Sequence, residues 1–235
     1  SYCLSSIALR FRFRDLVLVK NELQFFLDHK VPQVKFVDRT FNCRHGHAME
    51  IWKYILEHDN GVTNFHFEVS ADLFTEEELK LLGQMRPGLV QLEIGVQSAN
   101  PQTLKAIRRK TDLRKLENAV ARIREKENIH QHLDLIAGLP WEDYESFRRS
   151  FDYVYKMRPD QLQLGFLKVL KGSSMEMEAK EYGMVFKTRE PYEILSTKWL
   201  SYEEILKLKM VESMVEVYYN SGQFQHTLNL SLIHI

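Results

Sequence analysis

Strand and helix patterns alternate in strict order along most of this chain, and this alternation limits the possible folds more than any other feature. Five short segments read as strands, and segments with apolar residues at helical spacing lie between them. The strand segments are VKFVD (34–38), FHFEVS (65–70), LVQLEIGVQ (89–97), HLDLIAG (132–138) and LQLGFL (162–167). Repeated strand–helix units of this length predict an α/β fold with a parallel sheet and right-handed crossovers.

The starts of several predicted helices carry capping residues. Thr75 and Glu78 match a capping box, and so do Ser201 and Glu204. Asn100 matches an N-cap and is followed by proline, which is well tolerated at the first helical position. These signals predict helix starts at three places that the apolar periodicity also indicates.

Each predicted strand has one apolar and one polar face, because side chains alternate along a strand. In the second segment the apolar side chains are Phe65, Phe67 and Val69, and the polar ones are His66, Glu68 and Ser70. A doubly wound sheet buries both faces, and a closed eight-stranded barrel fills its interior with Val, Ile and Leu. The polar face therefore favours a partial, open barrel of the TIM type that holds a large polar ligand.

Composition excludes several classes of protein. The 235 residues are 44% hydrophobic and 27% charged, and 32 Lys and Arg balance 32 Asp and Glu, so nucleic acid is not indicated as a partner. Only two cysteines occur, which argues against a disulfide-rich secreted domain and favours a cytoplasmic protein. No apolar run approaches the roughly 20 residues of a membrane span. A signal peptide is not visible at the start of the chain.

Two further segments show a resemblance to a known family. GVQSANPQTLKAIRR (95–109) and DLIAGLPWEDYESFRRSF (134–151) together resemble the radical S-adenosylmethionine (SAM) superfamily, near its methylthiotransferases, Elongator catalytic subunits and coproporphyrinogen oxidases. VKFVDRTFN (34–42) resembles a strand of the cobalamin-binding branch. The resemblance covers residues 1–185 and implies a partial (β/α)6 barrel. We expect 186–235 to be a C-terminal helical extension or the start of a further domain.

The resemblance also gives a meaning to the first residues, SYC. The family binds a 4Fe–4S cluster through Cys-x3-Cys-x2-Cys with an aromatic residue before the last cysteine, so Cys3 would be the third ligand and Tyr2 that aromatic. Three thiolates leave the fourth iron open for SAM. On this interpretation the chain is an N-terminally truncated fragment that lacks two ligands and the first barrel strand. We expect such a fragment neither to assemble a stable cluster nor to cleave SAM.

The resemblance carries the family's SAM contacts over to four positions, and two further residues are candidates beside them. Glu68, Gln97 and Asp134 match residues near the SAM ribose and amino-acid groups, and the strand alternation independently puts all three on polar faces. Arg109, twelve residues after the glutamine, matches an arginine on the following helix. Asp38 stands where many relatives hold the SAM amino group with a Gly-Gly-Glu-type segment, and Ser70 is a further polar-face residue. Each has an ordinary structural alternative, such as a cap or a solvated side chain.

The resemblance implies an enzyme in which SAM is cleaved reductively to a 5′-deoxyadenosyl radical that acts on an unknown substrate. It implies a 4Fe–4S cluster and SAM as cofactors, cobalamin through a missing N-terminal domain, and an electron donor such as flavodoxin or ferredoxin. Two alternatives stay open: a non-radical barrel enzyme, and a non-catalytic binding protein with a degenerate cluster site. Cys43, His45 and His47 have metal-like spacing, but a zinc site usually needs a second such pair, so a solvated helix start is the preferred interpretation.

Overall fold

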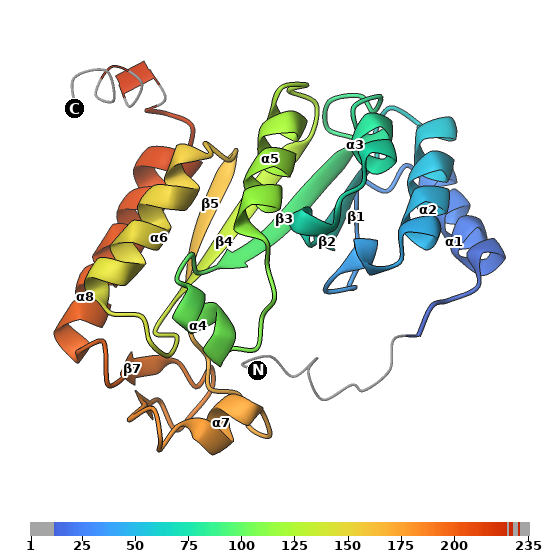
Figure 1. Ribbon diagram of the computed structural model, residues 1–235. Helices are drawn as coiled ribbons and strands as arrows, with labels where there is room; N and C mark the ends of the chain where they lie inside the picture. The colour runs from blue at the N-terminus through green and yellow to red at the C-terminus, as the bar shows by residue number, and fades with distance from the viewer. Residues whose placement is uncertain (1–11, 225, 228–229, 231–235) are drawn as a thin grey trace. The chain divides into compact units, whose positions relative to one another are not determined.

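The computed structural model describes residues 12–224, 226, 227 and 230, and a five-stranded sheet is its main feature (Figure 1). The strand order is β1-β2-β3-β4-β5, and the β1–β2 and β2–β3 pairs are parallel. The strands are β1 (Gln33–Lys35), β2 (Asn64–Val69), β3 (Val90–Gln97), β4 (His130–Ala137) and β5 (Gln161–Phe166). The α/β class and the parallel sheet agree with the sequence prediction.

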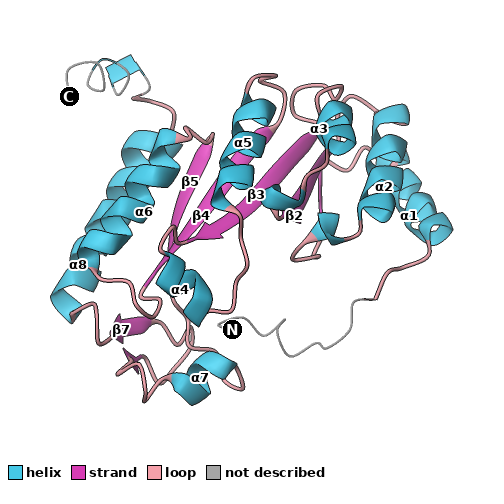
Figure 2. Ribbon diagram, in the orientation of Figure 1, coloured by secondary structure: helices cyan, strands magenta, loops and turns pink. Residues whose placement is uncertain are grey.

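Helices alternate with these strands (Figure 2). The α-helices are α1 (Leu16–Asp28), α2 (His45–Glu57), α3 (Glu76–Leu82), α4 (Pro101–Ala106), α5 (Leu113–Arg124), α6 (Tyr144–Lys156), α7 (Ser174–Glu178) and α8 (Tyr202–Met214). Short 3-10 turns occupy Phe41–Cys43 and Ala71–Leu73, and α8 continues as a π-helix over Val215–Asn220. A small antiparallel pair is formed by β6 (Val185–Phe186) and β7 (Ile194–Ser196).

The described chain divides into two compact units. The N-terminal unit contains the described residues up to Gly95 together with Thr111–Leu133. The C-terminal unit contains Val96–Lys110 and the described part of Asp134–Ile235. Because the division crosses β3 and β4, each unit is described separately below.

Aromatic side chains form the core of the N-terminal unit. Phe67 of β2 stacks on Phe36 at 4.5 Å and lies 4.4 Å from Phe41, both measured between ring centroids. Trp52 of α2 meets the same ring edge-on at 6.0 Å. Trp52, Phe65 and Phe67 are fully buried, so the apolar face of the strands is the face that the helices cover.

In the C-terminal unit, the residues after α8 cover the edge strand β5. Asn220 accepts a hydrogen bond from the Leu162 backbone N–H and donates one to the Leu162 carbonyl, both at 2.9 Å. Tyr219 packs on Tyr155 of α6 and donates its hydroxyl to the Pro159 carbonyl. These contacts satisfy backbone groups at a sheet edge that would otherwise be open to another strand.

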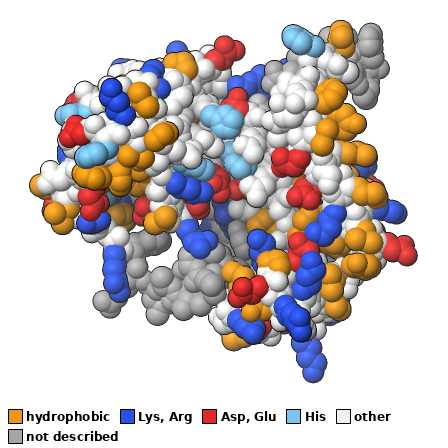
Figure 3. All heavy atoms as spheres, turned by 180° about the vertical axis from the view of Figure 1, so that it is seen from behind, with side chains coloured by type: hydrophobic (Ala, Val, Ile, Leu, Met, Phe, Trp, Pro, Cys, Tyr) orange, Lys and Arg blue, Asp and Glu red, His pale blue; other side chains and the backbone are white. Residues whose placement is uncertain are grey.

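The outer face of α8 is also apolar. Tyr202, Leu206, Met210 and Met214 recur every four residues and are between 43% and 59% exposed, whereas Ile205 and Leu208 are buried. Figure 3 shows hydrophobic side chains gathered along this side of the molecule. The helix therefore has apolar residues on both faces. Among the described residues, no helix combines the length and apolarity needed to cross a bilayer.

The predicted helix starts are confirmed. Both capping boxes form, with Thr75 accepting from the Glu78 backbone N–H and Ser201 from that of Glu204. Asn100 caps α4 through the backbone N–H of Gln102.

The first predicted strand is shorter than expected. The sequence predicts a strand over 34–38, whereas β1 covers Gln33–Lys35 and its last ladder bond runs from the Phe36 N–H to the His66 carbonyl. Val37 and Asp38 are exposed beyond this bond, at an edge of the described sheet. Alternation of side chains therefore identified the strand but not its end. The expected division at residue 185 stays a prediction, as does a strand before Cys3, which falls outside the described residues.

Candidate functional site

The polar face of the N-terminal unit carries two neighbouring carboxylates. Glu68 of β2 and Glu93 of β3 are direct partners in the parallel register. Strands in a sheet lie about 4.8 Å apart, so side chains of partner residues on the same face are close neighbours. Two like charges in this arrangement repel each other, and the pair requires a compensating group.

Lys35 supplies that group from β1. Its Nζ atom lies 3.0 Å from Glu93 Oε2 and 3.7 Å from Glu68 Oε1. The backbone partner of Lys35 is His66 on β2, so the lysine side chain crosses the face of β2 to reach a carboxylate on β3. One ammonium therefore contacts both carboxylates.

His66 completes this polar cluster of Lys35, His66, Glu68 and Glu93. Its Nε2 atom lies 2.9 Å from Glu93 Oε2, although the two groups are not aligned as a hydrogen bond. Burial, followed by the charge of Lys35, lowers the pKa of His66, while Glu93 acts in the opposite direction. The imidazole is therefore mainly neutral at pH 7.

The two carboxylates respond differently to this environment. Burial raises the pKa of Glu68, and the charge of Glu93 raises it further, against the opposing effects of Lys35 and Arg39. Burial also acts to raise the pKa of Glu93, but the hydrogen bond and charge of Lys35 outweigh it, so this pKa is lowered. Proximity to the lysine thus determines which carboxyl is the stronger acid.

In the C-terminal unit, Gln97 is the last residue of β3 and has a strained backbone. Its φ is 70°, in the left-handed region that residues other than glycine rarely adopt. The side chain is buried, and its amide oxygen has no hydrogen-bond partner among the described residues. Strained residues with unsatisfied buried polar atoms are frequent at ligand sites. The amide oxygen of Gln97 is therefore a hydrogen-bond acceptor without a partner among the described residues, at the end of β3.

A buried carboxylate holds the segment that follows Gln97. Glu142 Oε1 accepts hydrogen bonds from the hydroxyls of Ser98 at 2.6 Å and Ser150 at 2.8 Å. The same hydroxyls accept the backbone N–H groups of Asn100 and Ala99 at 3.0 Å. Burial raises the pKa of Glu142 to about 7, and the two serine hydrogen bonds act against this rise.

The loop after β4 depends on a glycine. Gly138 has a φ of +88°, and an added Cβ would lie 2.7 Å from Ile194 Cγ2. No other residue fits this conformation and this close approach without displacing Ile194. The loop continues to Trp141, whose carbonyl accepts a hydrogen bond from the Asn100 side chain at 2.8 Å.

The remaining predicted site residues are more dispersed. Asp134 lies on the polar face of β4 in the C-terminal unit, between the buried Leu133 and Leu135. Arg109 follows α4 rather than lying on it, because that helix ends at Ala106. Asp38 is exposed in the loop after β1.

Ser70 serves a local structural role in the N-terminal unit. Its hydroxyl donates to Asp72 at 2.7 Å, and its backbone groups are paired with the side chain of Asn42. Tyr2 and Cys3 fall outside the described residues, so the structure gives no information on the predicted cluster ligand. The assignment of all these residues to a cofactor stays a prediction.

The sequence interpretation did not assign roles to Lys35, His66, Glu93 or Glu142. Alternation along the strands had already put His66 and Glu93 on the polar face, and the same alternation applied to VKFVD puts Lys35 opposite Phe36. Only the pairing of β1 with β2 and of β2 with β3 shows that Lys35, His66 and Glu93 contact one another. Glu142 lies in a loop, where no periodic pattern signals burial.

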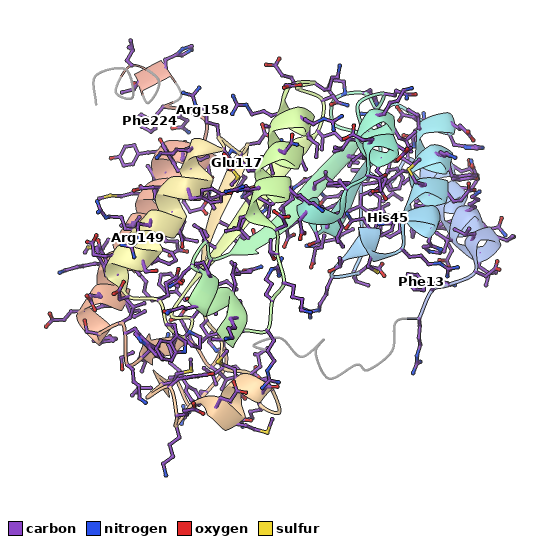
Figure 4. The ribbon with its side chains drawn as sticks, in the orientation of Figure 1. Phe13, His45, Glu117, Arg149, Arg158 and Phe224 are labelled. Atoms are coloured by element: carbon purple, nitrogen blue, oxygen red, sulfur yellow. The ribbon has the colours of Figure 1, made fainter. Side chains whose placement is uncertain are left out.

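The metal-like spacing of Cys43, His45 and His47 has a structural explanation. His45, at the start of α2 (Figure 4), pairs with buried Glu78 at 3.1 Å, and His47 packs edge-on against Phe13. Cys43 is an exposed free thiol. Among the described residues, no group of three or more His, Cys, Asp or Glu side chains could hold a metal ion.

Comparison with known families agrees with this architecture. Residues 1–154 match the family described as "Radical SAM superfamily". The chain belongs to the radical SAM superfamily. Residues 180–235 match a second family, described as "Protein of unknown function (DUF4080)". Radical SAM proteins use a 4Fe–4S cluster and SAM and need a source of electrons.

Curated relatives within the superfamily are distant. The chain is 28% identical over 127 residues to a probable threonylcarbamoyladenosine tRNA methylthiotransferase of Pyrococcus abyssi, which is 54% of this chain and 29% of that protein. It is 30% identical over 107 residues to the oxygen-independent coproporphyrinogen III oxidase of Salmonella typhimurium, covering 43% of this chain and 23% of the relative. This radical SAM chain therefore matches less than a third of the length of either protein.

Solved radical SAM structures share the fold. The methyltransferase TsrM from Kitasatospora setae, with cobalamin and a 4Fe–4S cluster bound, superposes with a TM-score of 0.64 at 19% identity, over 78% of this chain and 36% of that one. Coproporphyrinogen III oxidase from Escherichia coli gives 0.56 at 18% identity, over 84% and 46%. At these identities the likeness establishes a radical SAM type of partial barrel and nothing about substrate.

Proposed function

We propose that the protein containing this chain is a radical SAM enzyme that cleaves SAM reductively and uses the resulting radical on a substrate still to be identified. The proposal is supported by the family match over residues 1–154. One structural observation carries it within the chain: the buried amide oxygen of Gln97, without a partner among the described residues, at the end of a barrel strand. Parallel-barrel enzymes bind their ligands at the carboxyl ends of strands.

The residues present suit the parts of SAM that they would contact. The Gln97 amide oxygen would accept a hydrogen bond from a ribose hydroxyl, and so would the Asp134 carboxylate. Glu68 would complement the positively charged sulfonium or ammonium group of SAM. Arg109, Asp38 and Ser70 are secondary contacts in this proposal, and Asp38 is weakened by its exposure after the shortened β1.

Cys3 would hold the cluster, preceded by Tyr2 and with two further thiolates from outside this sequence. When bound, a 4Fe–4S cluster supplies the electron that cleaves SAM to methionine and a 5′-deoxyadenosyl radical. The task of this chain is then to orient SAM and exclude water. A cytoplasmic location, a flavodoxin or ferredoxin as electron donor, and cobalamin bound by a separate domain belong to the same proposal.

Iron content and SAM cleavage test the proposal together. The full-length protein should be reconstituted anaerobically as wild type, as Cys3→Ala and as Cys43→Ala, which removes the other cysteine. We expect wild type and Cys43→Ala to bind about four irons and form 5′-deoxyadenosine with dithionite. Cys3→Ala should lose both properties. Unchanged iron in Cys3→Ala would refute the ligand assignment, and no 5′-deoxyadenosine from cluster-loaded wild type would refute the function.

A further inference from the structure

The polar cluster poses an electrostatic problem that the proposed function does not address. Glu68 and Glu93 are register partners on adjacent strands, so their like charges are neighbours on one face. A carboxylate that must present a negative charge to a cationic ligand should not lose that charge to a neighbouring carboxylate. The polar face needs a device that keeps Glu68 ionised.

Lys35 has the geometry of such a device. Its Nζ lies 3.0 Å from Glu93 and 3.7 Å from Glu68, so the shorter contact goes to the carboxylate that no SAM role has been assigned to. The same oxygen of Glu93, Oε2, is approached by both Lys35 Nζ and His66 Nε2, the latter at 2.9 Å. Of the two contacts that Lys35 makes, Glu68 has the longer one, at 3.7 Å, so its carboxylate oxygens can still accept hydrogen bonds from a ligand.

We infer that Lys35 is a positioning residue of the SAM site, which draws Glu93 away and keeps Glu68 ionised and oriented toward the ligand. This inference rests on the proposed function, because it takes Glu68 as the group that complements the cationic part of SAM. Lys35 itself does not contact the ligand. Its effect reaches the ligand through the charge of Glu68.

The titratable groups around the cluster agree with this role. The charged groups that act on Glu68 are Glu93, which raises its pKa, and Lys35 and Arg39, which lower it, after the larger effect of burial. Glu93 is influenced by Lys35, His66 and His132. Removal of Lys35 therefore takes away a major charge that favours the ionised form of Glu68, and its pKa should rise further.

The inference is tested by SAM affinity as a function of pH, measured by calorimetry on the full-length, cluster-loaded protein. Lys35→Met should weaken binding roughly two- to five-fold near pH 7, the effect of one partly exposed ion pair. The loss should diminish as the pH rises, because Glu68 then ionises without help. Lys35→Arg should restore the wild-type profile. Lys20→Met, which removes a similar 3.0 Å ion pair with Glu50 between α1 and α2, is the matched control and should leave the profile unchanged.

A direct titration of the Glu68 carboxyl by carbon-13 NMR gives a readout that does not depend on catalysis. Lys35→Met should shift this titration to higher pH, whereas loss of packing alone would weaken SAM binding equally at every pH. An unshifted titration, or a pH-independent loss of affinity, would overturn the inference. If Glu68→Ala has no effect on SAM affinity, the assignment of Glu68 to the SAM site fails instead, whereas the proposed function itself fails if cluster-loaded wild type forms no 5′-deoxyadenosine. If Glu68→Ala weakens binding and Lys35→Met does not, only the inference fails.

Discussion

The pKa values of two carboxylates, Glu93 in the N-terminal unit and Glu142 in the C-terminal unit, are shifted in opposite directions. The Glu93 side chain is 21% exposed and has a lysine at 3.0 Å, and its pKa falls below the ordinary value despite burial. Glu142 is fully buried and receives two serine hydroxyls, and burial raises its pKa to about 7. At Glu142 the two serine hydrogen bonds do not offset the effect of burial on the pKa, whereas at Glu93 the nearby lysine does.

The difference separates two uses of a carboxylate within one fold. Glu142 joins Ser98 to Ser150 and so holds the segment after Gln97, a task for which it can be protonated or ionised. Glu93 pairs with a cation on a polar face and remains ionised. Substitutions of these carboxylates or of their partners should therefore change stability and pKa values in ways that distinguish the two sites.

The largest expected effect is a pH-dependent change in the free energy of unfolding that is due to Glu142. Its carboxyl titrates near 4.5 when unfolded and at about 7 when folded, so the folded state binds the proton more tightly. The stabilising contribution is complete below pH 4.5 and is lost as the pH rises to about 7. The linked change in the free energy of unfolding is about 3 kcal/mol. Glu142→Gln should abolish this slope, measured by urea denaturation of the chain from pH 4 to 8.

Glu145→Gln is the control for that experiment, because Glu145 is exposed on α6, three residues after Glu142, and pairs with Arg148. It should keep the wild-type slope between pH 4.5 and 7. If Glu142→Gln shows the same slope as wild type, Glu142 does not carry the buried proton, and the contrast with Glu93 is wrong.

A smaller effect is expected at Ser150. Ser150→Ala removes a hydrogen bond to Glu142 and the acceptor of the Ala99 N–H, and should lower the free energy of unfolding by about 1–2 kcal/mol. It should also raise the pKa of Glu142 further, since the lost hydrogen bond acts to lower it. Ser213→Ala, at an exposed position of α8, removes a hydrogen bond to the Lys209 carbonyl and should be close to neutral in the same denaturation experiment. Equal effects of the two variants would contradict the network.

The smallest change in stability is expected from a substitution of Glu93. The same substitution tests most directly whether Glu93 controls the pKa values of its neighbours. Glu93→Gln should change the free energy of unfolding by less than about 1 kcal/mol, because the ion pair with Lys35 is partly exposed. The pKa of His66 should fall further and that of Glu68 should fall toward its ordinary value, since Glu93 raises both. NMR titration of His66 and Glu68 would measure these shifts, and unchanged titrations would show that Glu93 does not control the cluster.

Local patterns predicted much of the fold. Alternation in FHFEVS separated buried Phe65 and Phe67 from Glu68, and the capping signals at Thr75 and Asn100 located helix starts, because these features depend on neighbours in sequence. The end of β1 was misjudged, because its pairing with β2 stops at His66 although β2 continues to Val69, and the point where pairing stops is not visible in the local sequence.

The site was predicted only in part, for the same reason. The alternation of side chains revealed the polar face. Lys35 and Glu93, however, are 58 residues apart in the sequence and lie on β1 and β3, with β2 between them. The hydrogen bonds of Glu142 go to Ser98 and Ser150, which are 44 and 8 residues away in the sequence. A left-handed backbone at Gln97 has no sequence signal, because such conformations are usually associated with glycine.

The central claim is that the polar faces of these strands contact SAM. Calorimetric titration of SAM into the full-length, cluster-loaded protein tests it with the variants Glu68→Ala, Gln97→Ala and Asp134→Ala. We expect each variant to weaken binding by about 1–3 kcal/mol, the cost of leaving a buried or charged partner unpaired. Glu117→Ala, an exposed residue on α5 (Figure 4), should bind as wild type does. Wild-type affinity in all three polar-face variants would contradict the account.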